Sequence, residues 1–352
     1  MIESLRYSRN LAGVLLKDWW RYQRALQAGD ESYLAICNRN ERLDRAPGGG
    51  GYRCEWQWTS DLHAPKYVRA LGLALMRRAL ADHPFVAASA PQALTNSPDV
   101  SFIIGHRGLD RIPQLLASLA RIAGQRGASV ECIIVEQDVE PHVAAKLPNW
   151  VRYVHTPPPD RAMPYCRSWA FNVGVRLCRG SVVVLHDNDM LVPADYAAGI
   201  LRHVRSGNEV VNLKRFIFYL TERHTRALMA GTAGLTDTAP ESVMQNSEGG
   251  GSIAITRDAY ERIGGFDESF IGWGGEDNEF WERAQTLRVW PYGSLPFVHL
   301  WHPPQVKKYG HDNPTLERYR ALANVTVEVR IASLRDRTSG AMTGPASSSS
   351  PV

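Results

Sequence analysis

The sequence predicts an α/β protein in which helices flank a mostly parallel sheet. From residue 99 onward, short apolar runs alternate with amphipathic helical segments, and this alternation is typical of a parallel sheet covered by helices. The chain has 352 residues, of which 44% are hydrophobic and 22% are charged. These proportions allow a large buried core, so wholesale disorder is excluded.

Each predicted element follows from its local pattern. The run at residues 100–104 is short, continuous and apolar, which is typical of a buried strand, and the segment after it repeats apolar residues at helical spacing. Similar patterns recur up to a helix that begins near Pro314. Strands are predicted at residues 100–104, 130–135, 151–154, 181–185, 252–256 and 296–300. Helices are predicted at 111–122 and 166–178; a third begins near 257, and a fourth ends near 287.

Residues 1–95 do not share this alternation. They contain an aromatic and basic helix with Trp19 and Trp20, and a second helical run at 67–81. We therefore expect a mainly helical segment appended to a main unit at 96–335. The two tryptophans lie beside basic residues, so they either pack on the main unit or dock on a membrane surface or an acceptor.

Charge and cysteine content limit the possible partners and compartment of the protein. A formal net charge of +4 is too small for a nucleic-acid binder, which needs a clustered basic face. The five cysteines include no CxxC pair, which favours a reduced compartment, and no apolar stretch approaches the ~18 residues of a membrane span. We expect a cytoplasmic protein, soluble or peripheral to the inner face of the membrane, with a disordered Ser- and Pro-rich tail at 336–352.

Polar residues follow three of the predicted strands. Arg107 comes after the first strand, Glu136 and Asp138 come with the second, and an acidic Asp-Asn-Asp triplet at 187–189 comes after the fourth. In open parallel sheets the ligand crevice lies beyond the carboxyl ends of the strands. We therefore expect these side chains to share one site.

The acidic triplet and two histidines are candidate metal ligands. Carboxylate oxygens suit Mg²⁺ and Mn²⁺, and Mn²⁺ also tolerates imidazole. His299 and His302 lie three residues apart at the end of the last predicted strand, where one could bind a metal and the other a phosphate. Each group alone also has a simpler interpretation, because Asp-Asn-Asp is common in turns and a histidine pair near a strand end is often structural.

The segment Trp-Gly-Gly-Glu-Asp at 273–277 is a more specific pattern. Two glycines allow a ligand to approach the backbone closely, and the indole of Trp273 offers a flat face on which a sugar can stack. Glu276 and Asp277 open a helix, where an anionic side chain is stabilised by the free N–H groups. One of the two acids can act as a cap, which leaves the other free to accept a proton.

Taken in order, these motifs resemble the nucleotide-sugar glycosyltransferases of the GT-A fold. The nearest likeness is to the β-1,4-galactosyltransferase family (glycosyltransferase family 7) and to bacterial chondroitin-polymerase-like transferases. The resemblance covers roughly residues 99–325. It rests on Arg107, Tyr165-Cys166-Arg167, Asn172-Val173-Gly174, Asp187-Asn188-Asp189, Gly250-Gly251, Gly265-Phe266-Asp267, Gly272 to Asp277 and His299-Leu300-Trp301-His302.

The resemblance implies a role for each matched residue. The implied nucleotide-sugar-binding residues are Arg107, Tyr165, Arg167, Asp187, Gly250, Gly251 and His302. The implied metal ligands are Asp189, in the DxD motif, and His299, which would hold Mn²⁺ or Mg²⁺. The implied acceptor-binding residues are Trp273 and Glu276, and the implied catalytic residues are Asp277, as the base, and Glu276.

The function expected from this resemblance is an inverting, metal-dependent glycosyl transfer. A hexose or N-acetylhexosamine, with galactose or GalNAc favoured, would move from a UDP-sugar to a hydroxyl of a glycan or lipid-linked acceptor in polysaccharide biosynthesis. The metal would neutralise charge on the departing diphosphate, and Asp277 would take the acceptor proton. The alternatives are a retaining polypeptide GalNAc-type transferase, a catalytically silent carbohydrate-binding protein of the same fold, and a nucleotidyltransferase of similar sheet topology.

Overall fold

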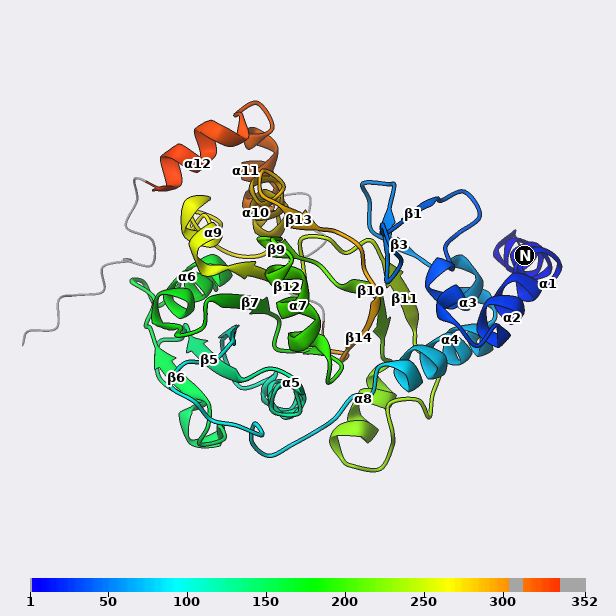
Figure 1. Ribbon diagram of the computed structural model, residues 1–352, viewed down its shortest axis with the longest axis horizontal. Coiled ribbons are helices and arrows are strands. Elements are labelled where there is room, and N and C mark those ends of the chain that lie inside the picture. Colours follow the sequence, from blue (N-terminus) through cyan, green and yellow to red (C-terminus); the bar gives the residue numbers. More distant parts are fainter. Residues whose placement is uncertain (1, 304–312, 336–352) are drawn as a thin grey trace, which may run out of the picture.

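A seven-stranded sheet forms the centre of the protein, whose structure is a computed structural model that describes residues 2–303 and 313–335 (Figure 1). Its strand order is β13-β9-β12-β7-β4-β5-β6. Only β12 runs antiparallel to its two neighbours, and the other adjacent pairs are parallel, so the predicted mostly parallel sheet is confirmed. The strands are β4 (Val100–His106), β5 (Val130–Glu136), β6 (Arg152–His155), β7 (Val182–His186), β9 (Val210–Val211), β12 (Ser252–Thr256) and β13 (Val289–Trp290).

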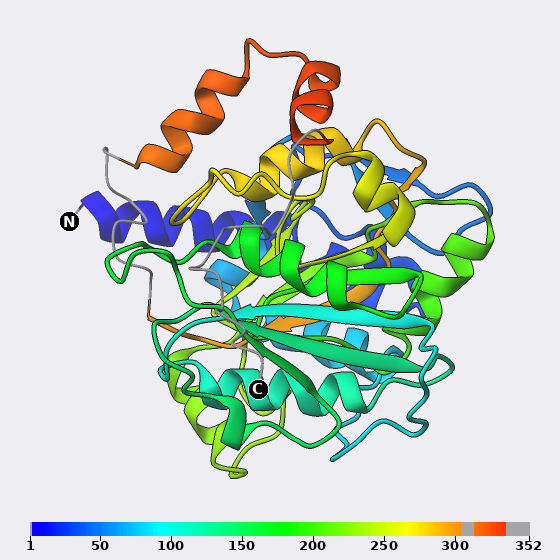
Figure 2. The same ribbon diagram turned by 90° about the vertical axis from the view of Figure 1, so that its left-hand side faces the viewer.

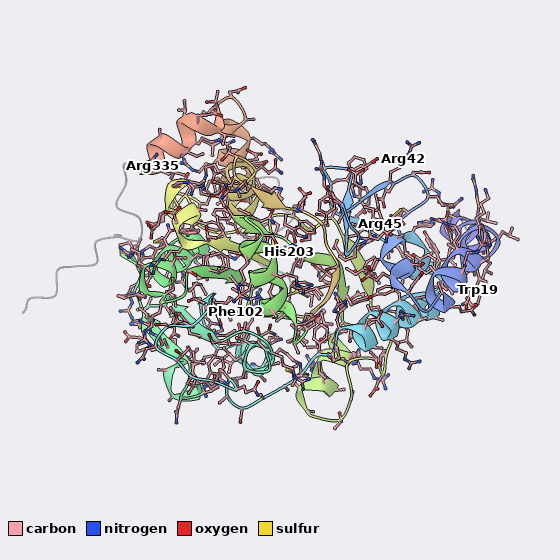
Figure 3. The ribbon with its side chains drawn as sticks, in the orientation of Figure 1. Trp19, Arg42, Arg45, Phe102, His203 and Arg335 are labelled. Carbon is pink, nitrogen blue, oxygen red and sulfur yellow. The ribbon has the colours of Figure 1, made fainter. Side chains whose placement is uncertain are left out.

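Helices cover both faces of this sheet, as the sequence predicts. Successive residues of a strand point to opposite faces, and in β4 Phe102 and Ile104 belong to one buried cluster while Ile103 belongs to another. Figure 3 labels Phe102 within the core near the middle of the molecule. The first cluster includes residues of α5 (Ile112–Ala123) and α7 (Tyr196–Arg205), and the second includes residues of α6 (Arg167–Leu177), α9 (Arg257–Arg262) and α10 (Glu276–Ala284).

A second sheet of five strands, which the sequence pattern does not reveal, joins the first core to the N-terminal segment. Its order is β3-β11-β10-β14-β8, with β10 parallel to β14. In β10, Ile217 packs into the core under α5 and α7, while Phe216 and Phe218 pack against the N-terminal helices. The elements of this region are β3 (Ser60–Asp61), β8 (Met190–Leu191), β10 (Lys214–Tyr219), α8 (Glu222–Met229), β11 (Ser242–Gln245) and β14 (Leu295–His299).

From residue 2 onward, the N-terminal segment contains four α-helices and three short strands and packs on the second sheet (Figures 1 and 2). The buried guanidinium of Arg215 ties the two together, because it donates to the carbonyls of Leu34 and Ile36 at 2.6 Å each. No helix in the described ranges is long and apolar enough to cross a membrane. The elements are α1 (Ile2–Lys17), α2 (Trp19–Gln27), η1 (Glu31–Ala35), β1 (Leu43–Arg45), β2 (Tyr52–Cys54), α3 (His63–Tyr67) and α4 (Arg69–Asp82).

Two glycines set the position of α10, the helix that begins with the predicted acidic pair. Gly274 and Gly275 have φ values of 104° and 89°, in a region of backbone conformation that residues other than glycine rarely adopt. A Cβ on Gly275 would lie 2.9 Å from the Cβ of Tyr319. Helix α11 (Pro314–Leu322), which carries Tyr319, therefore packs closely against Gly275, and α12 (Val327–Arg335) packs on α10.

One further short helix, η2 (Ala144–Lys146), lies between β5 and β6.

All five cysteines are free thiols, and Cys132, Cys166 and Cys178 are buried as small apolar residues, as expected. The tail predicted to be disordered lies outside the described residues.

Candidate active site

A cavity of about 520 Å³ lies beyond the carboxyl ends of β4, β7 and β14. The N-terminal ends of α6, α10 and α11 complete its walls. This is the edge of the sheet at which the sequence places the ligand crevice. The side chains that carry charge or a titratable group in its lining are Arg111, Tyr165, Arg167, Asp187, Asp189, Glu276, Asp277, His299 and His302.

Asp189, His299 and His302 form a cluster that could hold a metal ion. One ligand atom from each lies within 4.8 Å of the others, and the Nε2 atoms of His299 and His302 lie 3.7 and 3.3 Å from the carboxylate of Asp189. One carboxylate and two imidazoles form a donor set that suits Mn²⁺ better than Mg²⁺. The structure thus brings His302 into the same group as the two predicted ligands.

The surroundings prepare these side chains to bind a cation. Burial lowers the pKa of His299, which favours the neutral imidazole that a metal requires. Nδ1 of His302 lies 2.7 Å from the carbonyl oxygen of Pro303, and an N–H there leaves the lone pair on Nε2. Burial alone would raise the pKa of Asp189, but the charges of His299, Arg111 and His302 lower it. The aspartate therefore stays an anion.

Arg167 connects the two acidic parts of the cavity. Its guanidinium donates to Asp187 at the end of β7 and to Asp277 in the first turn of α10, and a third bond of 3.5 Å reaches Glu276. Glu276 also accepts the N–H of Gly274 at 3.0 Å. Glu276 therefore stabilises the start of α10, and Asp277 makes fewer hydrogen bonds to the protein than Glu276 does.

Asp277 has the proton affinity of a general base at neutral pH. Burial raises its pKa to about 7, with the charge of Arg167 acting in the opposite direction and the charges of Glu276 and Asp187 acting in the same direction as burial. A base is most effective when its pKa lies near the working pH. Trp273 lies beside it with 37% of its surface exposed, so its indole is accessible to a ligand.

Three predicted donor residues, Arg107, Gly250 and Gly251, are absent from the lining of this cavity. Arg107 instead donates to the carbonyl of Met163 at 2.8 Å and approaches Asp138 at 4.0 Å. Gly251 packs near Met190 and Lys214.

Glu136, predicted from its strand end to share the site, is also absent from the lining. It accepts the hydroxyl of Tyr153 and the N–H of His142, which are structural bonds.

Tyr165 lines the cavity, whereas Gly250, the other donor residue that the resemblance implies, does not. The hydroxyl oxygen of Tyr165 would lie 2.1 Å from a Cβ on Gly105, so glycine is required at that position of β4. Gly250 lies in a neighbouring cleft, where a Cβ would lie 3.3 Å from Oδ2 of Asp277.

Sequence reasoning missed Arg111 and Lys214. Arg111 donates to Asp189 at 3.0 Å and brings a positive charge to the candidate metal cluster. Lys214 is buried, donates to the carbonyl of Ser252 at 2.6 Å, and has its pKa lowered to about 7 by burial. Arg111 is the first residue of a predicted amphipathic helix and Lys214 lies in an unpredicted strand, so neither stood in a recognisable motif.

Comparison with known proteins gives short but specific matches. A family model described as the N-terminal domain of galactosyltransferase matches residues 239–290, which include the Trp-Gly-Gly-Glu-Asp segment. Beta-1,4-galactosyltransferase 5 of Danio rerio is 29% identical over 130 residues, covering 35% of this chain and 27% of that protein. The same enzyme of Sus scrofa is 34% identical over 59 residues, covering 14% of this chain and 15% of that protein. The chain thus spans about a quarter or less of these relatives.

Solved structures show weaker overall similarity. The catalytic domain of Drosophila beta1,4galactosyltransferase 7 in complex with xylobiose aligns at 13% identity and a TM-score of 0.35, covering 62% of this chain and 79% of that one. The mannosyltransferase PcManGT from Pyrobaculum calidifontis, in complex with GDP-Man and Mn²⁺, aligns at 17% identity and a TM-score of 0.39, covering 78% and 74%. The family-model match over residues 239–290 and the sequence matches to these relatives confirm the predicted resemblance of this chain to the β-1,4-galactosyltransferases.

Proposed function

We propose that the protein is an inverting, metal-dependent glycosyltransferase. It moves a hexose or N-acetylhexosamine, with galactose or GalNAc favoured, from a UDP-sugar to a hydroxyl of a glycan or lipid-linked acceptor. One observation carries the proposal: a candidate metal cluster and a carboxylate with a pKa of about 7 line the same cavity. The match of residues 239–290 to a galactosyltransferase model supports the donor class.

The side chains divide the reaction between them. Asp189, His299 and His302 would hold the metal, which when bound supplies positive charge to stabilise the departing diphosphate. Asp277 accepts the proton of the acceptor hydroxyl. The acceptor oxygen then bonds to the anomeric carbon as the bond from that carbon to the UDP oxygen breaks, and its electron pair leaves with UDP. Attack from the face opposite UDP inverts the anomeric carbon.

Arg167 and Trp273 position the reactants around this step. Arg167 bonds to Asp277 and Asp187, so it fixes the base relative to the end of β7. Trp273 lines both the cavity and the cleft beside it, where its indole can hold the acceptor sugar near the base. Proximity of this kind removes part of the entropic barrier to a two-substrate reaction.

The direct test is calorimetric titration of the full chain with a panel of UDP-sugars, once with Mn²⁺ and once with EDTA. We expect one UDP-sugar to bind with Mn²⁺ and to lose its binding in EDTA. The anomeric configuration of the transferred sugar then distinguishes inversion from retention. Absence of binding by every nucleotide sugar would instead favour a catalytically silent carbohydrate-binding protein.

We also infer that the N-terminal helices rest on the cytoplasmic face of an anionic membrane, where a lipid-linked acceptor would be found. Apolar side chains on these helices are exposed, and Figure 3 shows Trp19 at their outer edge. Basic residues alternate with them, and each contributes about 1 kcal/mol near an anionic surface. The exposed apolar residues are Leu5, Tyr7, Leu15, Leu16, Trp19 and Trp20, and the basic ones are Arg6, Arg9, Lys17, Arg21 and Arg24.

We expect the protein to sediment with vesicles of 70% phosphatidylcholine and 30% phosphatidylglycerol, and to remain in solution with phosphatidylcholine alone. Replacing Leu16 and Trp20 by Ala should weaken this binding, because both side chains insert at the interface. Leu94→Ala is the matched control, since Leu94 is 66% exposed but lies outside these helices. Equal sedimentation of all variants, or none with either vesicle, would contradict the inference.

A further inference from the structure

A second cleft of about 610 Å³ adjoins the candidate active site. It shares Trp273, Glu276 and Asp277 with the first cavity, so a molecule in the cleft reaches the proposed base directly. Four segments form its walls: Gln57 and Thr59 of the N-terminal segment, the loop at 246–250, α10 with the residues just before it, and α11. The N-terminal segment lies outside the part of the chain that resembles glycosyltransferases, and yet it supplies one wall.

This N-terminal wall is held firmly in place. Strand β3 pairs with β11, and the chain beyond β11 turns at Asn246, which has a φ of 60°. Asn246 is the one non-glycine residue among those described that has a positive φ, a conformation that persists only where surrounding contacts enforce it. Its side-chain amide donates to the carbonyls of Trp56 and Trp58, and Thr59 donates to its carbonyl at 3.4 Å.

The same loop continues directly onto the proposed base. A Cβ on Gly249 would lie 2.8 Å from the carbonyl oxygen of Asp277, so the backbone of the loop touches the first turn of α10. Glu248 accepts the indole N–H of Trp281 at 2.8 Å. The bonds at Asn246 therefore fix the distance between the N-terminal wall and Asp277.

The charge of the cleft selects among acceptors. Its described lining contains the carboxylates of Glu248, Glu276, Asp277 and Glu282, and it contains no Lys, Arg or His. Arg167 pairs with Glu276 and Asp277, and Arg330 pairs with Glu282, so part of this charge is offset. Because the described lining offers the carboxylates and no cationic side chain, an anionic acceptor such as a uronate chain would still be disfavoured by like charges. Amide and hydroxyl groups of Gln57 and Thr59 and the indole of Trp273 suit the hydroxyls and the apolar faces of an uncharged sugar.

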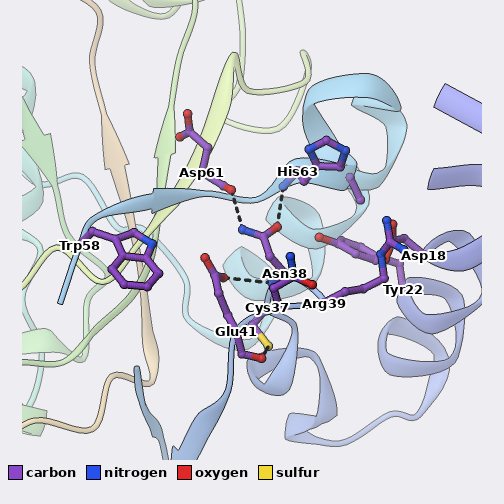
Figure 4. A pocket seen from close by; sticks show the side chains of 11 residues that line it. Asp18, Tyr22, Cys37, Asn38, Arg39, Glu41, Trp58, Asp61 and His63 are labelled. Atoms are coloured by element: carbon purple, nitrogen blue, oxygen red, sulfur yellow. Dashed lines mark hydrogen bonds and ion pairs between the residues drawn. The ribbon is translucent and has the colours of Figure 1, made fainter. Parts of the chain in front are cut away.

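A third cavity, of about 570 Å³, has Trp58 in its lining (Figure 4). Gln57 and Thr59 line the cleft, whereas Trp58, which stands between them in the sequence, lines this further cavity. Trp58 is 61% exposed, and Figure 4 shows its indole at one side of this cavity, with Glu41 and Asn38 among the other lining residues. An exposed indole opposite polar groups is a suitable surface for another sugar unit.

We propose that the acceptor is an uncharged oligosaccharide that the N-terminal segment helps to bind. The reacting sugar lies at Trp273 and Asp277, the next lies along Gln57 and Thr59, and more distant sugars lie on Trp58. This inference rests on the proposed function, because it names the acceptor of the same site. It assigns residues 57–59 as determinants of acceptor length.

The test measures kcat/KM for transfer to p-nitrophenyl glycosides of GlcNAc, chitobiose and chitotetraose, and to a hyaluronan tetrasaccharide, which carries uronates. We expect the tetrasaccharide of the neutral series to exceed its monosaccharide by roughly tenfold, which corresponds to about 1.4 kcal/mol, and hyaluronan to react poorly. Trp58→Ala should bring chitotetraose down to the value of chitobiose, and Gln57→Ala should lower both. Leu94→Ala, at an exposed site elsewhere, is the control.

The outcomes separate this inference from the proposed function. Equal kcat/KM for all lengths, an equal loss for all lengths in Trp58→Ala, or a preference for hyaluronan would overturn the inference while leaving the enzyme a glycosyltransferase. Binding of the UDP-sugar without transfer to any of these acceptors would also overturn it. Absence of UDP-sugar binding would overturn the proposed function itself.

Discussion

Asp277→Asn is expected to bind the UDP-sugar as the wild type does and to lose transfer activity by about 10²- to 10⁴-fold, the contribution of a positioned general base. The amide has nearly the size of the carboxylate and still offers an oxygen to Arg167, which donates to Asp277 in the wild type. It cannot take a proton from the acceptor hydroxyl. Calorimetry with the donor and single-turnover transfer measure the two properties separately.

The pH dependence of the wild type checks the same assignment. Burial raises the pKa of Asp277 to about 7, so the carboxyl is protonated below that pH and cannot act as a base. We therefore expect kcat/KM to fall about tenfold per unit as the pH drops below about 7 and to level off above it. Asp277→Asn should lack this acidic limb.

The matched control for Asp277→Asn is Asp258→Asn, because the side chain of Asp258 is 81% exposed on α9. Its turnover and its acidic limb should equal those of the wild type. Near-normal turnover of Asp277→Asn, or the same acidic limb in its residual activity, would show that another group accepts the proton.

The central sheet could be predicted from the sequence because each strand carries its own signal. The runs that form β4, β5 and β7 are buried on both faces and therefore read as continuous apolar stretches. The amphipathic helices between them repeat at helical spacing. Both patterns are local, so neither depends on knowing which segments meet in space.

The second sheet could not be predicted because its signals are not local. Strand β10 begins with Lys214 and Arg215, which break the apolar run although both side chains are buried. Their bonding partners are far away in the sequence: Lys214 donates to Ser252, and Arg215 donates to Leu34 and Ile36. Only the folded chain shows that these polar groups are satisfied.

The candidate site, like the fold, could be predicted only in part. Asp277, Asp189 and His299 stood in motifs, and the structure brings them to one cavity. Arg111, which lies 3.0 Å from Asp189, is separated from it by 78 residues of sequence. Residues 57–59 lie further still from the loop that they contact. Sequence patterns identify residues that could take part in chemistry. Contacts between segments that are distant in the sequence decide which of these residues share a site.

Asp189→Ala is expected to abolish metal-dependent donor binding. Asp189 is the one carboxylate in the described cluster, and its loss leaves two imidazoles beside the positive charge of Arg111. Loss of even an indirect ligand partner commonly costs 10- to 100-fold in metal affinity, so loss of the anionic ligand should cost at least about 100-fold. The readout is Mn²⁺ binding followed by electron paramagnetic resonance, without any nucleotide sugar.

Asp187→Ala is the matched control for this variant, because Asp187 lies two residues away and pairs with Arg167 rather than with the histidines. It should keep Mn²⁺ binding, and thermal unfolding of both variants excludes a loss of fold. If Asp189→Ala bound Mn²⁺ like the wild type, the cation would have another site, and the role of His299 and His302 would fall with that of Asp189. If both aspartates proved necessary, the whole acidic triplet, including the strand end that Arg167 holds, would belong to the metal site.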